Sequence, residues 1–395
     1  MRSFAIRISV LSLSFSLAGV AAAATHPAAD APSNTKTSAE TQSWDKAAAA
    51  KYLDDRQIWW QDWPHAQKDH GTVCVSCHTQ VPYALARPLL RVPLGEQKIS
   101  DPERAMLDSI IKRVNLGNEA ETFYSDAVHG PGKTHEARNA EDVNNVVILA
   151  SYDAARAASD AKTGIVYRTI PAIHLASLKA FDAMWAAQEQ TGPVAGAWIW
   201  QNFHFSPWEA PESEYYGAAM AALATGIAPD NYRDDLKIQP NLTLLRNYLL
   251  SHAAAQPLIN RVALLWASSK LPGLMTLQER EALANELSTK QHPDGGWSLT
   301  ELGQGTWKRH DETPFDLRSD GYATGIIVLA LEENGLAEIP ESKKGLAWIR
   351  SNQDKTDGRW PAWSVNVKRD PNSGVGKFMS DAATGFSVLA LEHSK

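Results

Sequence analysis

Most of the chain alternates between two kinds of helical segment. The first kind carries apolar residues at the spacing of an amphipathic helix, then a glutamine, a glycine-rich turn and a tryptophan, at residues 181–200, 283–299 and 346–363. The second kind is rich in alanine and leucine and has almost no polar face, at residues 213–226, 319–335 and 380–395. Because a helix that is apolar all round is buried on all sides, the second kind is expected to lie inside the first.

The two kinds of segment together form a repeated unit: an outer amphipathic helix, a turn, a loop and an inner buried helix. Six such units fit the chain, over roughly residues 45–92, 101–158, 172–227, 240–271, 277–335 and 340–395. Each unit buries its apolar face only against its neighbours, so six hairpins side by side close naturally into two rings. Strand patterns are nearly absent. The sequence therefore predicts an all-α fold, an (α/α)6 double-ring toroid of six helical hairpins over residues 45–395.

The first 24 residues are expected to form a signal peptide. Arg2 and Arg7 precede an apolar run at residues 10–24 that is too short to span a bilayer and ends in small residues. We expect cleavage near Ala24 and export to the periplasm, with a retained N-terminal anchor as the alternative. Residues 25–44 are rich in Ala, Thr, Ser and Pro, which predicts a disordered linker. No later stretch reaches about 18 uninterrupted apolar residues, so no transmembrane segment is expected in the mature chain.

The net charge argues against nucleic acid as a partner. The chain has a formal charge of −7, and loss of Arg2 and Arg7 with the signal peptide changes it to −9. An acidic chain without a basic block lacks the electrostatic footprint of a nucleic-acid-binding protein.

The segment at residues 343–360 carries a dense sequence motif. Its matching positions are Lys344, Gly345, Trp348, Ile349, Gln353, Gly358 and Trp360, and a looser copy has Gln291, Gly295 and Trp297. In these positions the chain resembles the QW repeat of squalene–hopene cyclases and related terpenoid cyclases. The resemblance implies the double-ringed helical fold. It also implies that Gln291, Trp297, Gln353 and Trp360 are structural, since in that family the glutamine amide ties helix ends together and stacks on the tryptophan.

The chemistry of that family is a weaker expectation. Hopene-forming cyclases protonate an alkene with an Asp-x-Asp-Asp motif, and this string does not occur in the chain. The nearest positional relatives are Asp320 and Asp381, each at the start of an expected inner helix, where a single Asp usually caps the helix. A cyclase or isomerase that uses Asp320 or Asp381 as its acid, with the cysteine pair structural, stays open as the alternative function. Carbohydrate lyases also use α/α barrels, but the chain offers no convincing carboxylate pair for one.

The two cysteines of the chain carry the strongest chemical motif. Cys74 and Cys77 are followed directly by His78 in the string CVSCH, and C-x-x-C-H is the attachment motif of c-type haem. Each thiol adds to one vinyl group of the porphyrin, and the adjacent histidine supplies the proximal ligand of the iron. The sequence therefore predicts one covalent haem c, bonded to Cys74 and Cys77 and ligated by His78.

Three other interpretations of the cysteine pair remain open. A thioredoxin-like dithiol belongs at the start of a helix in a βαβ context, which the chain does not show. Structural zinc needs a second pair of Cys or His ligands. A disulfide across this spacing closes a very small loop and constrains little.

The position of the motif in the repeat suggests where the sixth iron ligand lies. CVSCH falls between the outer and inner helices of the first unit, so the haem is expected to cover one mouth of the central cavity. The loops that open at the same end contain the candidate ligands His129, His135, His204, His310 and Met379. His129 and His135 are preferred because their unit is adjacent to the first. Without such a ligand the iron is five-coordinate.

The same loops are rich in aromatic residues, and the whole chain has 14 tryptophans. These side chains are expected to pack against the porphyrin and the turns, or to line an apolar cavity. The sequence thus predicts a periplasmic c-type haem protein that exchanges electrons with a periplasmic redox partner protein. Haem-dependent redox chemistry on an apolar small molecule in the cavity is the second form of this hypothesis.

Overall fold

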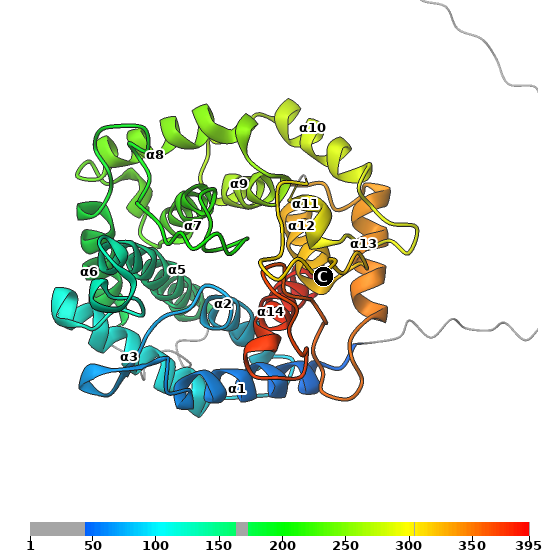
Figure 1. Cartoon of the computed structure of the whole chain (residues 1–395), viewed down its shortest axis with the longest axis horizontal. Coiled ribbons are helices and arrows are strands. Elements are labelled where there is room, and N and C mark those ends of the chain that lie inside the picture. The colour runs from blue at the N-terminus through cyan, green and yellow to red at the C-terminus, as the bar shows by residue number, and fades with distance from the viewer. Residues whose placement is uncertain (1–43, 163–172, 304, 395) are drawn as a thin grey trace, which may run out of the picture. The chain divides into compact units, whose positions relative to one another are not determined.

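The computed structural model describes residues 44–162, 173–303 and 305–394 (Figure 1). The expected signal peptide, its cleavage site near Ala24 and the expected linker up to residue 43 lie outside the described residues. Within them, fourteen α-helices account for most of the structure and the β-structure is one short hairpin and an isolated bridge, so the chain is all-α as expected. No helix in the described part of the chain is long and apolar enough to cross a membrane.

The helices fall into two sets that alternate along the chain. The first set is α1 (Lys46–Asp62), α3 (Asp101–Leu116), α6 (Ile173–Ala186), α8 (Gln239–His252), α10 (Leu277–Ser288) and α13 (Pro340–Ser351). The second set is α2 (Gln80–Arg91), α5 (Lys133–Lys162), α7 (Ser213–Ile227), α9 (Leu258–Lys270), α12 (Gly321–Glu333) and α14 (Phe378–His393). Figure 1 shows the first set lying outside the second.

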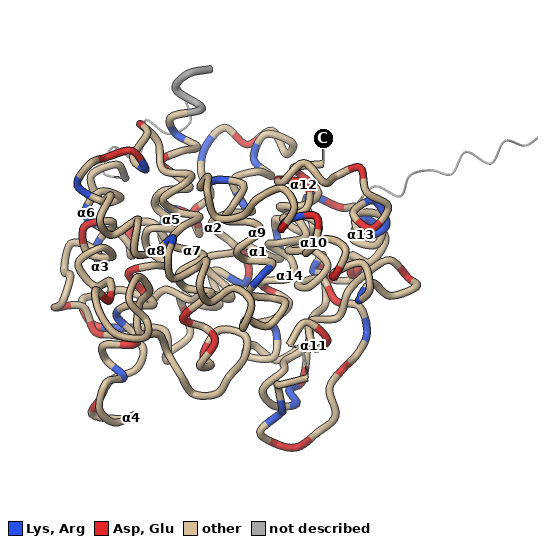
Figure 2. The backbone as a smooth tube through the Cα atoms, turned by 90° about the horizontal axis from the view of Figure 1, so that it is seen from above, with Lys and Arg blue, Asp and Glu red and all other residues tan. Residues whose placement is uncertain are grey.

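The loops contain shorter elements. These are β1 (Gln67–Lys68), β2 (Thr72–Val73), α4 (Asp126–His129), α11 (Leu299–Leu302) and the 3-10 turns at Asp69–Gly71, Gly117–Glu119, Tyr232–Asp234, Ala253–Ala255 and Val375–Lys377. In Figure 2, α4 and α11, which belong to different repeat units, project from the same end of the helices. Lys and Arg are interspersed with Asp and Glu in this view, and neither sign gathers on one side.

The inner helices pack against one another in order. Each of α2, α5, α7, α9 and α12 contacts the next inner helix along the chain, and α14 contacts both α12 and α2. Every residue of α12 from Gly321 to Leu331 is buried, which is the burial expected from a sequence without a polar face. Small residues allow the close approach: a Cβ atom added to Gly325 would lie 2.7 Å from the backbone nitrogen of Ser387 in α14.

Three glutamines tie neighbouring units together by the same pair of hydrogen bonds. In each, the side-chain nitrogen donates to the carbonyl of a glycine in its own turn and to a carbonyl at the start of the next outer helix. The sets are Gln188 with Gly196 and Asn241, Gln291 with Gly295 and Glu341, and Gln353 with Gly358 and Asp45, at 2.8–3.0 Å. These bonds give Gln291 and Gln353 the structural role that the sequence suggests.

The tryptophans of the same turns are fully buried and fix the end of the preceding outer helix. The indole nitrogens of Trp198, Trp297 and Trp360 donate to the carbonyls of Met184, Leu287 and Ile349 at 2.7–2.8 Å. A buried indole N–H needs such a partner, because an unpaired polar group in the core costs about 1–3 kcal/mol.

The turn glycines allow direct contact between backbones. Gly358 has φ +81°, and a Cβ atom added there would lie 2.4 Å from the carbonyl of Ala48 in α1. The turn that follows α13 therefore packs on the first helix of the described fold, and this contact leaves no space for a side chain.

A glycine substitution tests this close approach. We expect Gly358→Ala to lower the free energy of unfolding by about 3 kcal/mol, from the strained backbone and the forced displacement of α1 together. Gly335→Ala is the matched control, since Gly335 has φ +77° but nothing within 4 Å of an added Cβ atom, and should cost only about 1–2 kcal/mol. Denaturant unfolding followed by circular dichroism measures both, and equal losses would contradict the packing argument.

Candidate haem-attachment site

The CVSCH segment connects the short hairpin to α2. The backbone nitrogen of Cys74 donates to the carbonyl of Ala66 at 3.0 Å, which extends the hairpin by one bond. The indole nitrogen of Trp60, in α1, donates to the carbonyl of Cys74 at 2.9 Å. Both cysteines are free and buried, with exposed fractions of 2% for Cys74 and 7% for Cys77. The segment is thus held by its own hairpin and by the outer helix of its unit.

All three motif side chains line one cavity. Its empty volume, including the space at its opening, is about 1230 Å³. Its lining comes from four places in the chain, at residues 60–78, 123–144, 201–209 and 364–379. The loops of several units therefore meet at the motif, as the repeat pattern predicts, although none of the described residues of the fifth unit (277–335) is part of this lining.

The cavity is lined by both aromatic and polar side chains. Its aromatic lining residues are Trp60, Trp63, Phe123, Tyr124, Phe205, Trp208 and Phe378. Polar side chains are contributed by Glu141, Asn144, Gln201, Glu209, Ser364, Asn366 and Arg369. Aromatic side chains together with polar groups suit a large planar ligand such as a porphyrin.

His78 is held between aromatic rings. Its imidazole stacks on Phe378, with ring centroids 3.9 Å apart, and meets the ring of Trp60 edge-on at 5.2 Å. Its Nδ1 atom lies 2.8 Å from Oγ1 of Thr79. These contacts fix the plane of the imidazole ring relative to the cavity.

The hydrogen bonds around Thr79 determine which nitrogen of His78 carries the proton. Thr79 donates its one hydroxyl proton to the carboxylate of Asp381, at 2.7 Å. Its oxygen must therefore accept from His78, which places the imidazole proton on Nδ1. Nε2 is left unprotonated and has no hydrogen-bond partner among the described residues. An imidazole whose other nitrogen is held by such a bond is the form that ligates metals.

Asp381 anchors this arrangement and lies at the start of α14. Its carboxylate accepts from Arg56 at 2.6 and 2.9 Å and from the hydroxyl of Tyr52 at 2.9 Å, in addition to Thr79. Burial raises the pKa of Asp381, while Arg56 and these hydrogen bonds oppose the shift. As a candidate acid, Asp381 is thus occupied by structural partners and does not line the cavity.

Burial keeps His78 neutral. It lowers the pKa of His78 to about 3, with a smaller contribution from the positive charge of Arg56. A neutral imidazole retains the lone pair that a metal ligand needs, so the environment of His78 suits ligation over the whole physiological range of pH.

The surroundings of the two thiols raise their pKa, whereas a redox dithiol needs a lowered pKa. Burial, with a contribution from the negative charge of Glu209, raises the pKa of Cys77 to about 12, and burial also raises the pKa of Cys74 well above its usual range. Catalytic C-x-x-C pairs depend on a lowered thiol pKa. In the part of the chain that the structure describes, no three or more His, Cys, Asp or Glu side chains group as ligands of one metal ion. The dithiol and zinc interpretations therefore gain no support.

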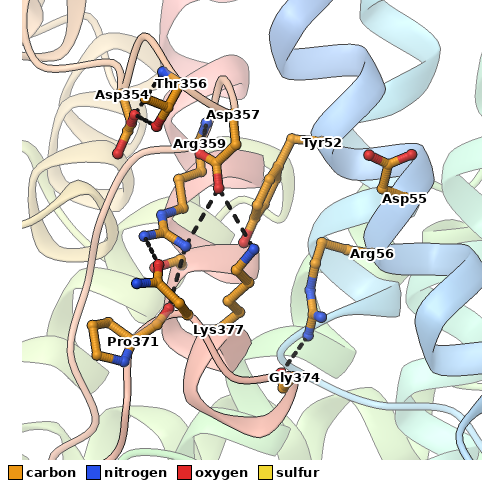
Figure 3. Close-up of polar contacts among 12 residues, drawn as sticks. Tyr52, Asp55, Arg56, Asp354, Thr356, Asp357, Arg359, Pro371, Gly374 and Lys377 are labelled. Carbon is orange, nitrogen blue, oxygen red and sulfur yellow. Dashed lines mark hydrogen bonds and ion pairs between the residues drawn. The ribbon is translucent and has the colours of Figure 1, made fainter.

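One wall of the cavity is the loop before α14, and basic side chains hold it in place. Arg56 donates to the carbonyl of Gly374 at 2.8 Å, and Arg359 donates to the carbonyl of Pro371 at 3.2 Å (Figure 3). Lys377 lies 3.6 Å from the carboxylate of Asp357, which Arg359 also contacts at 3.4 Å. This loop is therefore fixed from both α1 and the turn after α13.

The five candidates for the sixth iron ligand have different positions. Met379 lines the cavity, whereas His129, His135, His204 and His310 are not among its lining residues. His129 packs against the ring of Tyr124, with centroids 4.9 Å apart, and His135 contacts the amide of Asn139 at 3.3 Å. His310 makes a hydrogen bond of 2.9 Å with the carbonyl of His204.

Asp320, the other candidate acid, is the N-cap of α12. Its carboxylate accepts from the backbone nitrogens of Tyr322 and Ala323 at 2.9 Å each and from that of Leu299 at 2.6 Å. Burial raises the pKa of Asp320 to about 7. The residue satisfies helix-end donors, as a buried cap does, and it does not line the cavity.

Three residues of the site were not predicted from the sequence. Thr79 follows the motif directly, and a hydroxyl beside the predicted iron ligand was a usable signal. Glu209 and Tyr124 come from loops with no motif, and only the fold brings them to the cavity. A comparison with protein-family models and with curated proteins found no match to this chain.

The state of His78 can be measured on the full chain purified under reducing conditions without haem. We expect the nitrogen NMR signals of His78 to report a neutral ring protonated at Nδ1 from pH 8 to pH 5. A histidine in a short model peptide, which titrates near pH 6.5, provides the reference.

A pair of substitutions at Thr79 tests whether its hydroxyl determines this tautomer of His78. Thr79→Val removes the acceptor of Nδ1–H, so proton occupancy should spread to Nε2, while Thr79→Ser should retain the native tautomer. A His78 signal that becomes an imidazolium near pH 6 in the wild-type chain would disprove the assignment.

Proposed function

We propose that this chain is a periplasmic c-type haem protein, with the haem bonded to Cys74 and Cys77 and ligated by Nε2 of His78. The observation that carries the proposal is that all three motif side chains line one cavity and that the bond from His78 to Thr79 leaves Nε2 unprotonated. The raised pKa values of the thiols add support, because they are unfavourable for the competing dithiol function.

We also propose that the helices form the (α/α)6 double-ring toroid of the QW-repeat cyclases. Three features support this: the sequential contacts of the inner helices, the contact of α14 with α2, and the recurring glutamine and tryptophan bonds. The chain then shares the architecture of that family without its acid motif.

Each residue of the site would have its own role in holding the haem. Cys74 and Cys77 would supply the two thioether sulfurs, and His78 the nitrogen that ligates the iron. The bound haem would supply reversible one-electron transfer. Thr79 and Asp381 orient His78, and the aromatic lining excludes water from the redox group. Outer hydrogen bonds of this kind keep a ligating imidazole in one orientation.

Electron exchange with a periplasmic redox partner protein is the function we favour. A second candidate is haem-dependent chemistry on an apolar small molecule, and one observation favours it: the cavity is lined by many aromatic side chains. Cyclase activity through Asp320 or Asp381 has no support from their contacts, since both carboxylates are occupied within the fold.

Co-expression of the full chain with a periplasmic haem-attachment system tests the proposal. We expect a coloured periplasmic protein that keeps its haem under denaturing conditions and whose mass exceeds that of the mature chain by one haem. Cys77→Ala should leave a single thioether and shift the pyridine haemochrome band, and Cys74→Ala with Cys77→Ala should abolish covalent attachment.

His204→Ala serves as the control, because His204 is exposed and lies outside the lining of the cavity. It should attach haem as the wild type does. A colourless, correctly exported wild-type protein whose two cysteines form a disulfide would reject the haem assignment.

A further inference from the structure

The cavity contains a carboxyl group that no motif predicts. Glu209 lies in its wall, and the hydroxyl of Tyr124 is 3.2 Å from both carboxylate oxygens. The backbone holds Glu209 firmly: its carbonyl accepts from the nitrogens of Phe203 and Phe205, and its nitrogen donates to the carbonyl of Phe205, all at 2.8 Å. The carboxylate is therefore presented to the cavity from a fixed point of the loop.

Glu209 differs from the other carboxylates nearby because it has no cationic partner. Glu141, which also lines the cavity, is paired with Arg113 by bonds of 2.5 and 2.8 Å. Lys133 is directed to Glu136 at 2.6 Å instead. No Lys, Arg or His of the described residues lies within ion-pair distance of Glu209. A negative charge in a largely apolar cavity without such a partner is costly.

The charged and titratable groups around Glu209 come from every wall. Tyr124 and Lys133 face it from the second unit, Cys77 from the first, and Arg369 and Glu141 line the same cavity. Burial raises the pKa of Glu209 to about 7, and the hydrogen bond from Tyr124 and the charge of Lys133 oppose that shift. Its carboxyl thus changes charge near neutral pH.

We propose that Glu209 is the proton-exchanging residue of the cavity and that it couples proton uptake to electron transfer there. This inference rests on the haem function proposed above. An added electron and the carboxylate charge repel each other strongly in a cavity of low polarity. Protonation of Glu209 removes that repulsion, and Tyr124 positions the carboxyl group.

The coupled step is balanced in charge and atoms. On reduction the site gains one electron from a periplasmic one-electron donor protein, and the carboxylate of Glu209 gains one proton from water to form an O–H bond. On oxidation the electron passes to an acceptor protein, that O–H bond breaks, and the proton returns to water. Net uptake is at most one proton for each electron, and it is largest at a pH where the carboxyl is ionised before reduction and protonated after it.

The midpoint potential of the purified holoprotein, measured from pH 5.5 to pH 8.5, tests the coupling. In the wild type it should fall as the pH rises through the region around 7, because reduction favours the protonated carboxyl. Glu209→Gln cannot titrate and should give a potential independent of pH in this range. Tyr124→Phe removes a bond that favours the charged carboxylate, so the dependence should persist but move to higher pH.

Glu281→Gln is the matched control, since it removes an exposed carboxylate from α10 and should leave the wild-type profile unchanged. A Glu209→Gln holoprotein with a wild-type profile would overturn the proposal, as would a Tyr124→Phe profile unchanged from the wild type.

Infrared spectroscopy separates this inference from the haem assignment. In the purified full chain we expect a carboxylic acid band that disappears as the pH rises through about 7 and that Glu209→Gln removes. Absence of that band from the wild type would overturn the role of Glu209, whether or not haem is attached. A chain that shows the band but never attaches haem would overturn the coupling together with the haem function.

Discussion

The buried carboxylate of Asp381 is the contact on which both the fold and the site depend. It accepts hydrogen bonds from Tyr52 and Arg56 in α1 and from Thr79 at the start of α2. One residue of α14 therefore joins α1 and α2 and orients the imidazole of His78. Removing two charges from water is expensive, and the pair is tolerated because the guanidinium and the hydroxyls satisfy the carboxylate.

The remaining contacts between the two ends of the described fold reinforce this junction. Gln353 bonds to the backbone of Asp45, the turn at Gly358 packs on Ala48, and Arg56 reaches the carbonyl of Gly374. The junction between α1 and the segment from α13 to α14, here called the seam, is thus held by polar bonds, close backbone packing and apolar helix contacts. This seam also forms a wall of the cavity. Distortion of the seam is therefore transmitted to the environment of His78.

The sequence was most informative where periodic patterns or local motifs decide the structure. The helices, the burial of α12 and the bonds of Gln291 and Gln353 follow from spacing and composition, because each depends on nearby residues or on a repeated neighbour. The cavity was less predictable, since its walls come from loops far apart in the chain. Neither the adjacency of units, which favoured His129, nor any motif could show that Glu209 lies in the lining and His129 outside it.

The low exposure of Cys74 and Cys77 has a consequence for the biosynthesis of the protein. The cavity that they line is walled in part by Phe378 and its preceding loop, which belong to the sixth unit, residues 340–395. Any enzyme that modifies these thiols has freer access before this unit docks. During maturation of the site, modification of the thiols thus precedes the docking of this unit.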